Sequence, residues 1–220
     1  MCRFLLVKSK EIVKPEKLLK EFALMCQKSH APDGDWQGDG WGVAWQEHNS
    51  WKLHKSLSPI WEDQDLFSSF PQTNIFAVHA RSAGFPQHKN NLEFNQPYIN
   101  NNLCFVFNGM IRGVKIPKVL NGKIGAQKMF SFLIEETKAK NERDSLKNLD
   151  QTMLTNSKLV EGMNVGLISS NNFYILCEYS LHPSYFSLQY FQKDDLTLVC
   201  SEKFSDYPWQ TMSRGEIKIL

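Results

Sequence analysis

The chain has 220 residues, 42% of them hydrophobic and 22% charged, a balance typical of a globular protein with one substantial core. Its formal net charge of +2 gives no electrostatic reason to expect nucleic acid or an anionic membrane as a partner. No apolar run approaches the ~20 residues that span a bilayer, and the early charges argue against a secretory signal. The five cysteines are widely spaced without a CxxC pair, which predicts neither a zinc site nor a disulfide framework and favours a reducing cytoplasm.

The first half of the chain predicts strands around one helix. Residues 3–7 form a short apolar run with strand character. Pro15 opens a segment whose apolar residues, as far as Cys26, recur at helical spacing. Residues 29–40 are loop-like, and four further apolar runs predict strands: 43–45 and 51–53, which are typical of a hairpin, and 75–79 and 103–107.

The second half predicts helices followed by strands. A helix is expected from about Ala126 to Thr137, and the highly charged residues 138–150 should form a solvated helix or loop. The last apolar runs, separated by turn-forming residues, predict an antiparallel meander: 165–168, 173–177, 185–191 and 196–200. Strands at both ends with helices between them, and no repeat or linker, indicate one α+β domain.

Cys2 carries a chemical signal because of its position. Methionine aminopeptidase commonly removes Met1 before a small residue, and this step would give Cys2 a free α-amine. An α-amine has a pKa of ~7.7–8.0 and a thiol one of ~8.5, so one residue would hold both the base and the nucleophile. Alone, however, a Met-Cys start fits better the buried first residue of a strand.

Further motifs accompany Cys2 along the chain. Gly38-Asp-Gly-Trp-Gly42 places three glycines at the entry to a strand, where glycine permits positive φ or close backbone approach. An apolar strand then ends in His79-Ala-Arg-Ser82. Asn95-Gln-Pro-Tyr98 precedes the strand that ends in Phe107-Asn-Gly109, although an Asn-Gly pair by itself is most often a hairpin turn.

Together and in this order, these segments resemble the class II glutamine amidotransferases, the cysteine branch of the N-terminal nucleophile hydrolases, and above all their short stand-alone members. The resemblance extends from Cys2 to about residue 111 and resumes weakly at residues 199–203 and 209–215. It implies a four-layer αββα sandwich with two antiparallel sheets, formed by residues 1–220 as a single glutamine amidotransferase type-2 domain. It implies no cofactor and no metal.

The resemblance also assigns roles to the residues that match the family's motifs. Cys2 is similar to the nucleophile, and Arg81 to the arginine that binds the substrate α-carboxylate through a planar bidentate fork. Asn108 and Gly109 match the oxyanion pair, through a side-chain amide and a backbone N–H respectively. Three more residues of these motifs are candidates for substrate binding: Asp39, Ser82 and Gln96.

Some positions remain open or depart from the family. His79 has no assigned role and is expected to be a buried, hydrogen-bonded structural residue. Asp39 could instead order the loop near Cys2 or form an Asx-turn. Gly125 stands where family members usually have an aspartate that binds the substrate α-amino group, so three residues are candidates to replace it: Asp39, Glu93 and Gln127.

We therefore expect hydrolysis of a γ-glutamyl amide, that of glutamine or of a γ-glutamyl conjugate, through a thioester on Cys2. The partner is then a small molecule, with no nucleic acid and no membrane. No segment resembles an ammonia-accepting synthase domain, so an amidotransferase would need a separate synthase subunit. The alternative is a relative with altered or lost catalysis that binds a metabolite or a partner protein. Gly125 favours this alternative, and the intact Cys2, Arg81 and Asn108-Gly109 argue against it.

Overall fold

The computed structural model describes residues 1–48 and 50–220. One set of strands comprises β1 (Arg3–Val13), β2 (Trp41–Glu47), β3 (Ser50–Ser56), β4 (Thr73–Ala80), β9 (Gln189–Lys193), β10 (Leu196–Cys200) and β11 (Gln210–Thr211). A second set comprises β5 (Tyr98–Asn100), β6 (Leu103–Arg112), β7 (Leu159–Ser169), β8 (Asn172–Tyr179) and β12 (Glu216–Ile219). The α-helices are α1 (Glu16–Lys28), α2 (Gly125–Glu136), α3 (Glu142–Asn156) and α4 (Pro183–Phe186), and short 3-10 helices cover Gln64–Ser69, Pro86–His88 and Leu92–Phe94.

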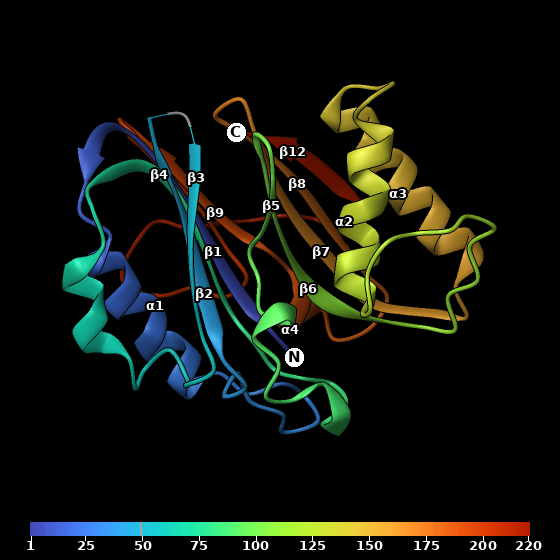
Figure 1. The fold of residues 1–220 in the computed structure, drawn as a ribbon, viewed down its shortest axis with the longest axis horizontal. Helices are drawn as coiled ribbons and strands as arrows, with labels where there is room; N and C mark the ends of the chain where they lie inside the picture. Colours follow the sequence, from blue (N-terminus) through green and yellow to red (C-terminus); the bar gives the residue numbers. More distant parts are fainter. Residues whose placement is uncertain (49) are drawn as a thin grey trace.

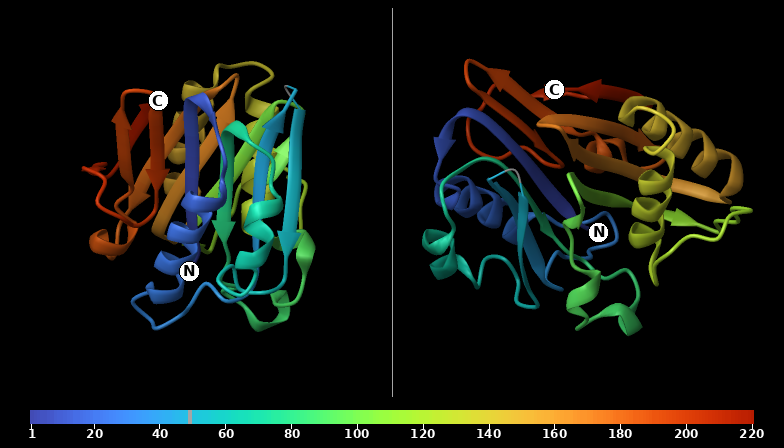
Figure 2. Two further views of the ribbon diagram at one scale, coloured as in Figure 1. Left: turned by 90° about the vertical axis from the view of Figure 1, so that its left-hand side faces the viewer. Right: turned by 45° about the horizontal axis from the view of Figure 1, so that its top comes forward.

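The strands form two antiparallel sheets that face each other. In the described part of the chain, the seven-stranded sheet has the order β11-β9-β10-β1-β4-β2-β3 and the five-stranded sheet the order β12-β8-β7-β6-β5. Helix α1 covers the outer face of the first sheet, and α2 and α3 cover the outer face of the second (Figures 1 and 2). The predicted four-layer αββα sandwich with two antiparallel sheets is therefore confirmed.

The four layers of the sandwich are separated by three apolar layers, which form because successive side chains of each strand point to opposite faces of its sheet. In β1, Leu5 and Val7 pack toward α1, whereas Phe4 and Leu6 pack between the sheets. The same period holds in the facing sheet, where Val106 of β6 lies in the layer between the sheets. A shift of one residue along a strand therefore moves a side chain from the face covered by helices to the face that packs against the opposite sheet.

Most predicted elements are present, with bounds that differ. Strand β1 continues to Val13, and the charged segment contains α3, whose Leu146, Leu149 and Met153 are buried against the five-stranded sheet. The predicted hairpin is the β2–β3 pair, in which Trp41 lies opposite Ser56. Asn49, part of the predicted hairpin turn, lies outside the described residues.

Two expectations for the C-terminal part are wrong. Residues 185–191 do not form one strand, because His182 is left-handed with φ 51° and Pro183 starts the short helix α4; the strand β9 begins only at Gln189. The last strands also do not form one meander. The β7–β8 pair belongs to the five-stranded sheet and the β9–β10 pair to the seven-stranded sheet, so the chain crosses between the sheets at α4.

Among the described residues, no helix combines the length and the apolar character required to span a bilayer.

Candidate active site

The start of β1 places Cys2 beside the end of β4. Register pairs Arg3 with Ala80 and Phe4 with His79, so the next positions outward are Cys2 and the turn after β4. The Cys2 Sγ accepts from the Ser82 N–H at 3.4 Å and lies 3.5 Å from the Ser82 carbonyl oxygen. The nucleophile predicted from the sequence therefore contacts the His-Ala-Arg-Ser motif directly.

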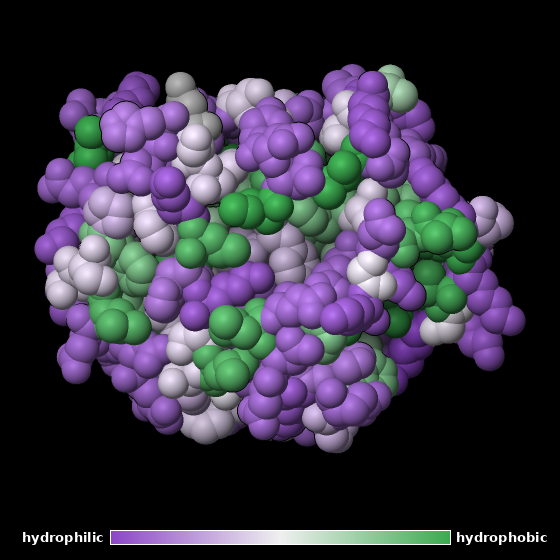
Figure 3. Space-filling view, viewed as in Figure 1, coloured by the Kyte–Doolittle hydropathy of each residue, from purple (hydrophilic) through white to green (hydrophobic). Residues whose placement is uncertain are grey.

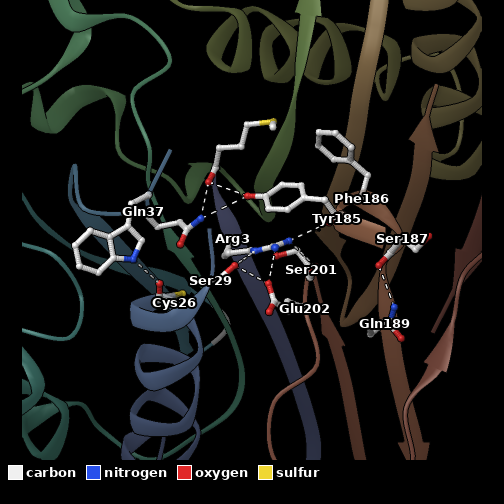
Figure 4. A network of polar contacts seen from close by, with 12 residues as sticks. Arg3, Cys26, Ser29, Gln37, Tyr185, Phe186, Ser187, Gln189, Ser201 and Glu202 are labelled. Atoms are coloured by element: carbon white, nitrogen blue, oxygen red, sulfur yellow. Dashed lines mark hydrogen bonds and ion pairs between the residues drawn. The ribbon is translucent and has the colours of Figure 1, made fainter. Parts of the chain in front are cut away.

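A buried arginine fixes the backbone next to Cys2 (Figure 4). Arg3 is 2% exposed, donates from Nε to Ser29 Oγ at 2.9 Å, and forms an ion pair with Glu202. Its Nη1 donates to the carbonyl oxygens of Tyr185 at 3.0 Å and Ser201 at 2.8 Å, and its guanidinium lies 3.7 Å from the centre of the Tyr185 ring. The first residues of β1 are thus tied to α1, α4 and the segment after β10, whose Ser-Glu pair belongs to the weaker part of the resemblance.

Polar groups also surround the bond between Met1 and Cys2. The Met1 amine donates to Asp35 Oδ2 at 2.7 Å, and the Met1 carbonyl oxygen accepts from Gln37 Nε2 at 2.9 Å and from the Tyr185 hydroxyl at 3.1 Å. Gln37 is fully buried, and its Oε1 has no hydrogen-bond partner in the described part of the chain. Sequence reasoning missed these three side chains, because only the fold brings the 29–40 loop and α4 to the start of the chain.

A cavity of about 610 Å³ opens at Cys2, within the range usual for small-molecule sites. Five residues predicted for the site line it: Cys2, Arg81, Ser82, Gln96 and Gly109. Asn108 and Asp39 are not among its lining residues. The fold thus gathers five of the seven predicted site residues on one surface.

Arg81 supplies a buried positive charge to this cavity. It is 4% exposed, and its two Nη atoms donate to Asn95 Oδ1 at 3.3 Å and to the His88 carbonyl oxygen at 2.6 Å. Among the described residues it has no carboxylate within ion-pair distance. Since an uncompensated buried cation is costly, the guanidinium is suited to a ligand anion.

Asn108 directly precedes the cavity-lining Gly109 in β6. Asn108 is fully buried, and neither of its side-chain polar atoms has a partner in the described part of the chain. Buried amides are almost always hydrogen-bonded, so an orphan at this place is an available donor and acceptor. Gly109 cannot be replaced easily, because a Cβ there would collide with the Gly162 carbonyl.

Two side chains hold the backbone just before this pair. The edge of β6 is open at Phe107 because β5 ends its pairing at Phe105. Gln96 closes this edge with its amide: its Oε1 accepts from the Phe107 N–H at 2.6 Å, and its Nε2 lies 3.3 Å from the Phe107 carbonyl oxygen. The His79 Nε2 lies 3.1 Å from the same oxygen, and burial lowers the pKa of His79 to about 3, so it is a neutral structural histidine as expected.

The glycine motif allows β2 to lie close to the segment that carries Asn95 and Gln96. Gly40 has φ +107°, and a Cβ on it would lie 2.6 Å from the Ser56 carbonyl oxygen. A Cβ on Gly42 would lie 2.5 Å from the carbonyl oxygen of Gln96. The strand β2 can therefore approach the segment that carries Asn95 and Gln96 only with glycine at these two positions.

Asp39 holds the turn that follows Arg81. Its Oδ2 accepts from the Ala83 N–H at 2.8 Å, its Oδ1 pairs with Lys89 at 3.1 Å, and its N–H donates to the Arg81 carbonyl at 3.0 Å. Of the two structural alternatives considered from the sequence, these contacts correspond to ordering the loop near Cys2.

With Met1 present, burial raises the pKa of the Cys2 thiol, against the lowering effects of the Met1 amine, the Ser82 N–H and Arg81. A base near this sulfur would favour its thiolate form. No cluster of three His, Cys, Asp or Glu side chains suited to a metal occurs in residues 1–48 and 50–220.

Comparison with known proteins places this architecture. No family model matches the chain, and no curated protein sequence matches it. A solved glutamine aminotransferase class-II domain protein from Silicibacter pomeroyi is 14% identical, with a TM-score of 0.68 over 99% of this chain and 94% of that chain. A structure described as a predicted glutamine amidotransferase from Pseudomonas aeruginosa is 13% identical, with a TM-score of 0.61 over 99% of this chain and 96% of that chain.

The chain has the fold of a class II glutamine amidotransferase domain. The same fold occurs in glutamine phosphoribosylpyrophosphate amidotransferase from B. subtilis, which is 15% identical, with a TM-score of 0.66 over 99% of this chain. This chain spans 47% of the length of that enzyme. At such identities the likeness concerns the fold, and the chemistry must be argued from the cavity itself.

Proposed function

We propose that the chain hydrolyses a γ-glutamyl amide through a thioester on Cys2 after removal of Met1. The proposal rests on three groups: the Cys2 sulfur and the buried Arg81, which line one cavity, and the buried Asn108 amide beside the cavity-lining Gly109. Among the described residues, Arg81 has no carboxylate partner and the Asn108 amide has no hydrogen-bond partner. The three groups would serve the three functions that acyl transfer needs: attack, orientation of the substrate, and stabilisation of an oxyanion.

The acylation step follows from these positions. The Arg81 guanidinium binds the substrate α-carboxylate as a bidentate fork and so presents the side-chain amide to Cys2. The free α-amine of Cys2 takes the thiol proton as Sγ attacks the amide carbon. The carbonyl oxygen becomes an oxyanion near the Gly109 N–H and the Asn108 side-chain amide, where one such donor typically stabilises the transition state by ~2.7–4 kcal/mol.

Collapse of this intermediate completes the reaction. The C–N bond breaks, the leaving amine takes the proton held by the α-amine, and the acyl group remains on Sγ as a thioester. Water then adds to the thioester, with the α-amine again as the base, and releases the carboxylic acid and the thiol. In the chain with Met1, Gln37 and Tyr185 both donate to the Met1 carbonyl oxygen, and the carbon of this carbonyl is bonded to the Cys2 nitrogen. The α-amine formed by removal of Met1 would therefore lie near both side chains.

The released ammonia is a product in its own right unless a second protein uses it. For an amidotransferase reaction, the acceptor would be bound by a synthase domain or subunit.

The test is intact mass spectrometry of purified protein with and without a glutamine-like diazo ketone, combined with ammonia release from a panel of γ-amides. We expect a mass that lacks Met1 and a single adduct on Cys2. Cys2→Ala should form no adduct and show no turnover, whereas the buried Cys200→Ala should keep both. Folded wild-type protein that forms no adduct and hydrolyses no γ-amide would contradict the proposal.

A second candidate is a relative that binds an acidic metabolite without turnover. The observation that favours it is Gly125, which lines the cavity where the family usually has an acidic residue. Unchanged ligand binding in Cys2→Ala, together with an inactive wild type, would favour this candidate.

A further inference from the structure

The charges around the cavity are of one sign. The cationic side chains in its wall are Arg81, Lys118 and Lys128, and in the described residues no aspartate or glutamate lines it. The first residues of α2, including Gly125, also lie in the wall, and the N-terminal end of a helix carries a partial positive charge. An ammonium group in this cavity would therefore meet only repulsive charges.

The acidic residues nearest in the chain are engaged elsewhere. Glu93 is 48% exposed and pairs with Lys123 at 2.9 Å outside the cavity wall. Both carboxylate oxygens of Asp39 are bound by the Ala83 N–H and Lys89. Asp35 accepts from the Ser82 hydroxyl and is not among the lining residues; its other partner, the Met1 amine, is lost when Met1 is removed. A substrate ammonium would thus be desolvated without a paired anion, which is costly.

The remaining wall is apolar. It is formed by the end of β6, by the segment 113–124 and by the first turn of α2, and includes Ile111, Val114, Ile116, Leu120 and Ile124. Val119 is 97% exposed on the same segment. Figure 3 shows hydrophobic surface gathered on the right-hand side of this face, where the segment between β6 and α2 lies in Figure 1.

The space beside Gly125 is open. Among the described residues, no atom lies within 4 Å of a Cβ built on Gly125, and its φ is not in the left-handed region. The absence of a side chain here extends the cavity between Arg81 and the apolar segment. A group attached to the α-carbon of a substrate held by Arg81 can therefore extend toward α2 without a collision.

We propose that the substrate is an N-acylated γ-glutamyl amide with an apolar acyl group, which rests on the segment 113–124 and the first turn of α2. This proposal depends on the function proposed above and specifies its substrate. Acylation converts the α-ammonium into a neutral amide, which removes the unpaired charge, and the acyl chain covers apolar surface that is otherwise exposed. The α-carboxylate remains for Arg81, and the side-chain amide remains for Cys2.

The experiment compares kcat/KM, by ammonia release, for glutamine, N-acetylglutamine, N-octanoylglutamine and deaminated glutamine (4-carbamoylbutanoate). We expect N-acetylglutamine to exceed glutamine at least ~10-fold, as for loss of an unpaired charge, and N-octanoylglutamine to exceed N-acetylglutamine because it buries more apolar surface. Deaminated glutamine should also exceed glutamine.

A matched pair of variants tests the position of the α-substituent. Gly125→Asp should shift the preference toward free glutamine by ~10-fold or more, since it supplies the missing anion, whereas the neutral Gly125→Asn should not. A wild type that turns over glutamine as well as or better than the acylated amides would overturn the inference. If Asp35→Asn then abolished that preference, Asp35 would be the ammonium site. No turnover of any amide, with no adduct on Cys2, would overturn the proposed function as well.

Discussion

The orphan amide of Asn108 predicts opposite effects of one substitution on stability and on catalysis. In Asn108→Leu, an apolar side chain of similar length replaces a fully buried amide whose two polar atoms lack partners among the described residues. A buried polar atom without a hydrogen bond costs ~1–3 kcal/mol in the folded state. The substitution should therefore stabilise the fold, although the slightly larger leucine offsets part of the gain.

The expected net stabilisation is ~1–2 kcal/mol, which corresponds to an increase in Tm of ~2–8 °C for a chain of this size. The same change removes an oxyanion donor, so kcat should decrease ~10²–10³-fold, with little change in KM. Differential scanning calorimetry and steady-state kinetics on the preferred γ-amide measure the two effects on the same preparation.

A neighbouring residue provides the control. Asn164 lies opposite Asn108 in the β6–β7 pair and is equally buried, but only its Oδ1 lacks a partner among the described residues, because its Nδ2 donates to the Phe186 carbonyl at 2.6 Å. Asn164→Leu removes this bond and should lower the Tm. If Asn108→Leu instead destabilises the fold as much as Asn164→Leu and keeps wild-type turnover, Asn108 is structural and the oxyanion assignment is wrong.

Three further outcomes can be tested on the same protein. Arg81→Lys should raise KM for an α-carboxylate substrate strongly and lower kcat mildly, because lysine keeps the charge and loses the bidentate fork; an unchanged KM would make Arg81 structural. Gln37→Leu should move the alkaline rise of kcat/KM to lower pH, because a lost acceptor beside the Cys2 α-amine disfavours its protonated form; an unmoved profile would place Gln37 outside the base's surroundings. Burial raises the pKa of Asp150 to about 6, so its contribution to stability is lost as pH rises from about 4 to 6. Asp150→Asn should therefore stabilise the fold at pH 7.5 by ~1 kcal/mol, after allowance for solvent screening, and not at pH 4, as thermal unfolding at the two pH values would show.

Sequence patterns predicted the parts of the fold that local periodicity controls. Helix α1 follows from the apolar spacing after Pro15, and β1 from the apolar run that begins at residue 3. Turn chemistry also predicts which strands are antiparallel neighbours, and both C-terminal hairpins formed as expected. Turn chemistry does not determine the sheet to which each hairpin belongs. The chain crosses between the sheets after His182 and Pro183, and the direction of this crossover depends on where Tyr185 and Phe186 are buried.

Some residues of the candidate site could likewise be predicted from the sequence, and others could not. The motif order singled out Cys2, Arg81 and Gly109, which line one cavity, because each stands in a short motif where glycine or polar residues interrupt an apolar run. The strand β6 does not end at Gly109, as the sequence suggested, but continues to Arg112. The residues around the Met1–Cys2 bond, Asp35, Gln37 and Tyr185, do not belong to a recognisable sequence motif. The Tyr185 hydroxyl bonds to a residue 184 positions away, and only the crossover at α4 brings the two together.

The reacting groups and the wall beside the substrate α-carbon come from different parts of the fold. The proposed nucleophile Cys2 and the proposed carboxylate-binding Arg81 lie at the start of β1 and the end of β4, and the proposed oxyanion pair Asn108-Gly109 lies within β6. The pairing of these strands with their neighbours fixes all three positions. The wall beside the substrate α-carbon comes instead from segment 113–124 and the start of α2, where Gly125 leaves open space. A substitution in this wall changes which α-substituent fits without moving a catalytic atom. The same reacting geometry can therefore serve a substrate that is not free glutamine, and the missing carboxylate argues for changed specificity more strongly than for lost catalysis.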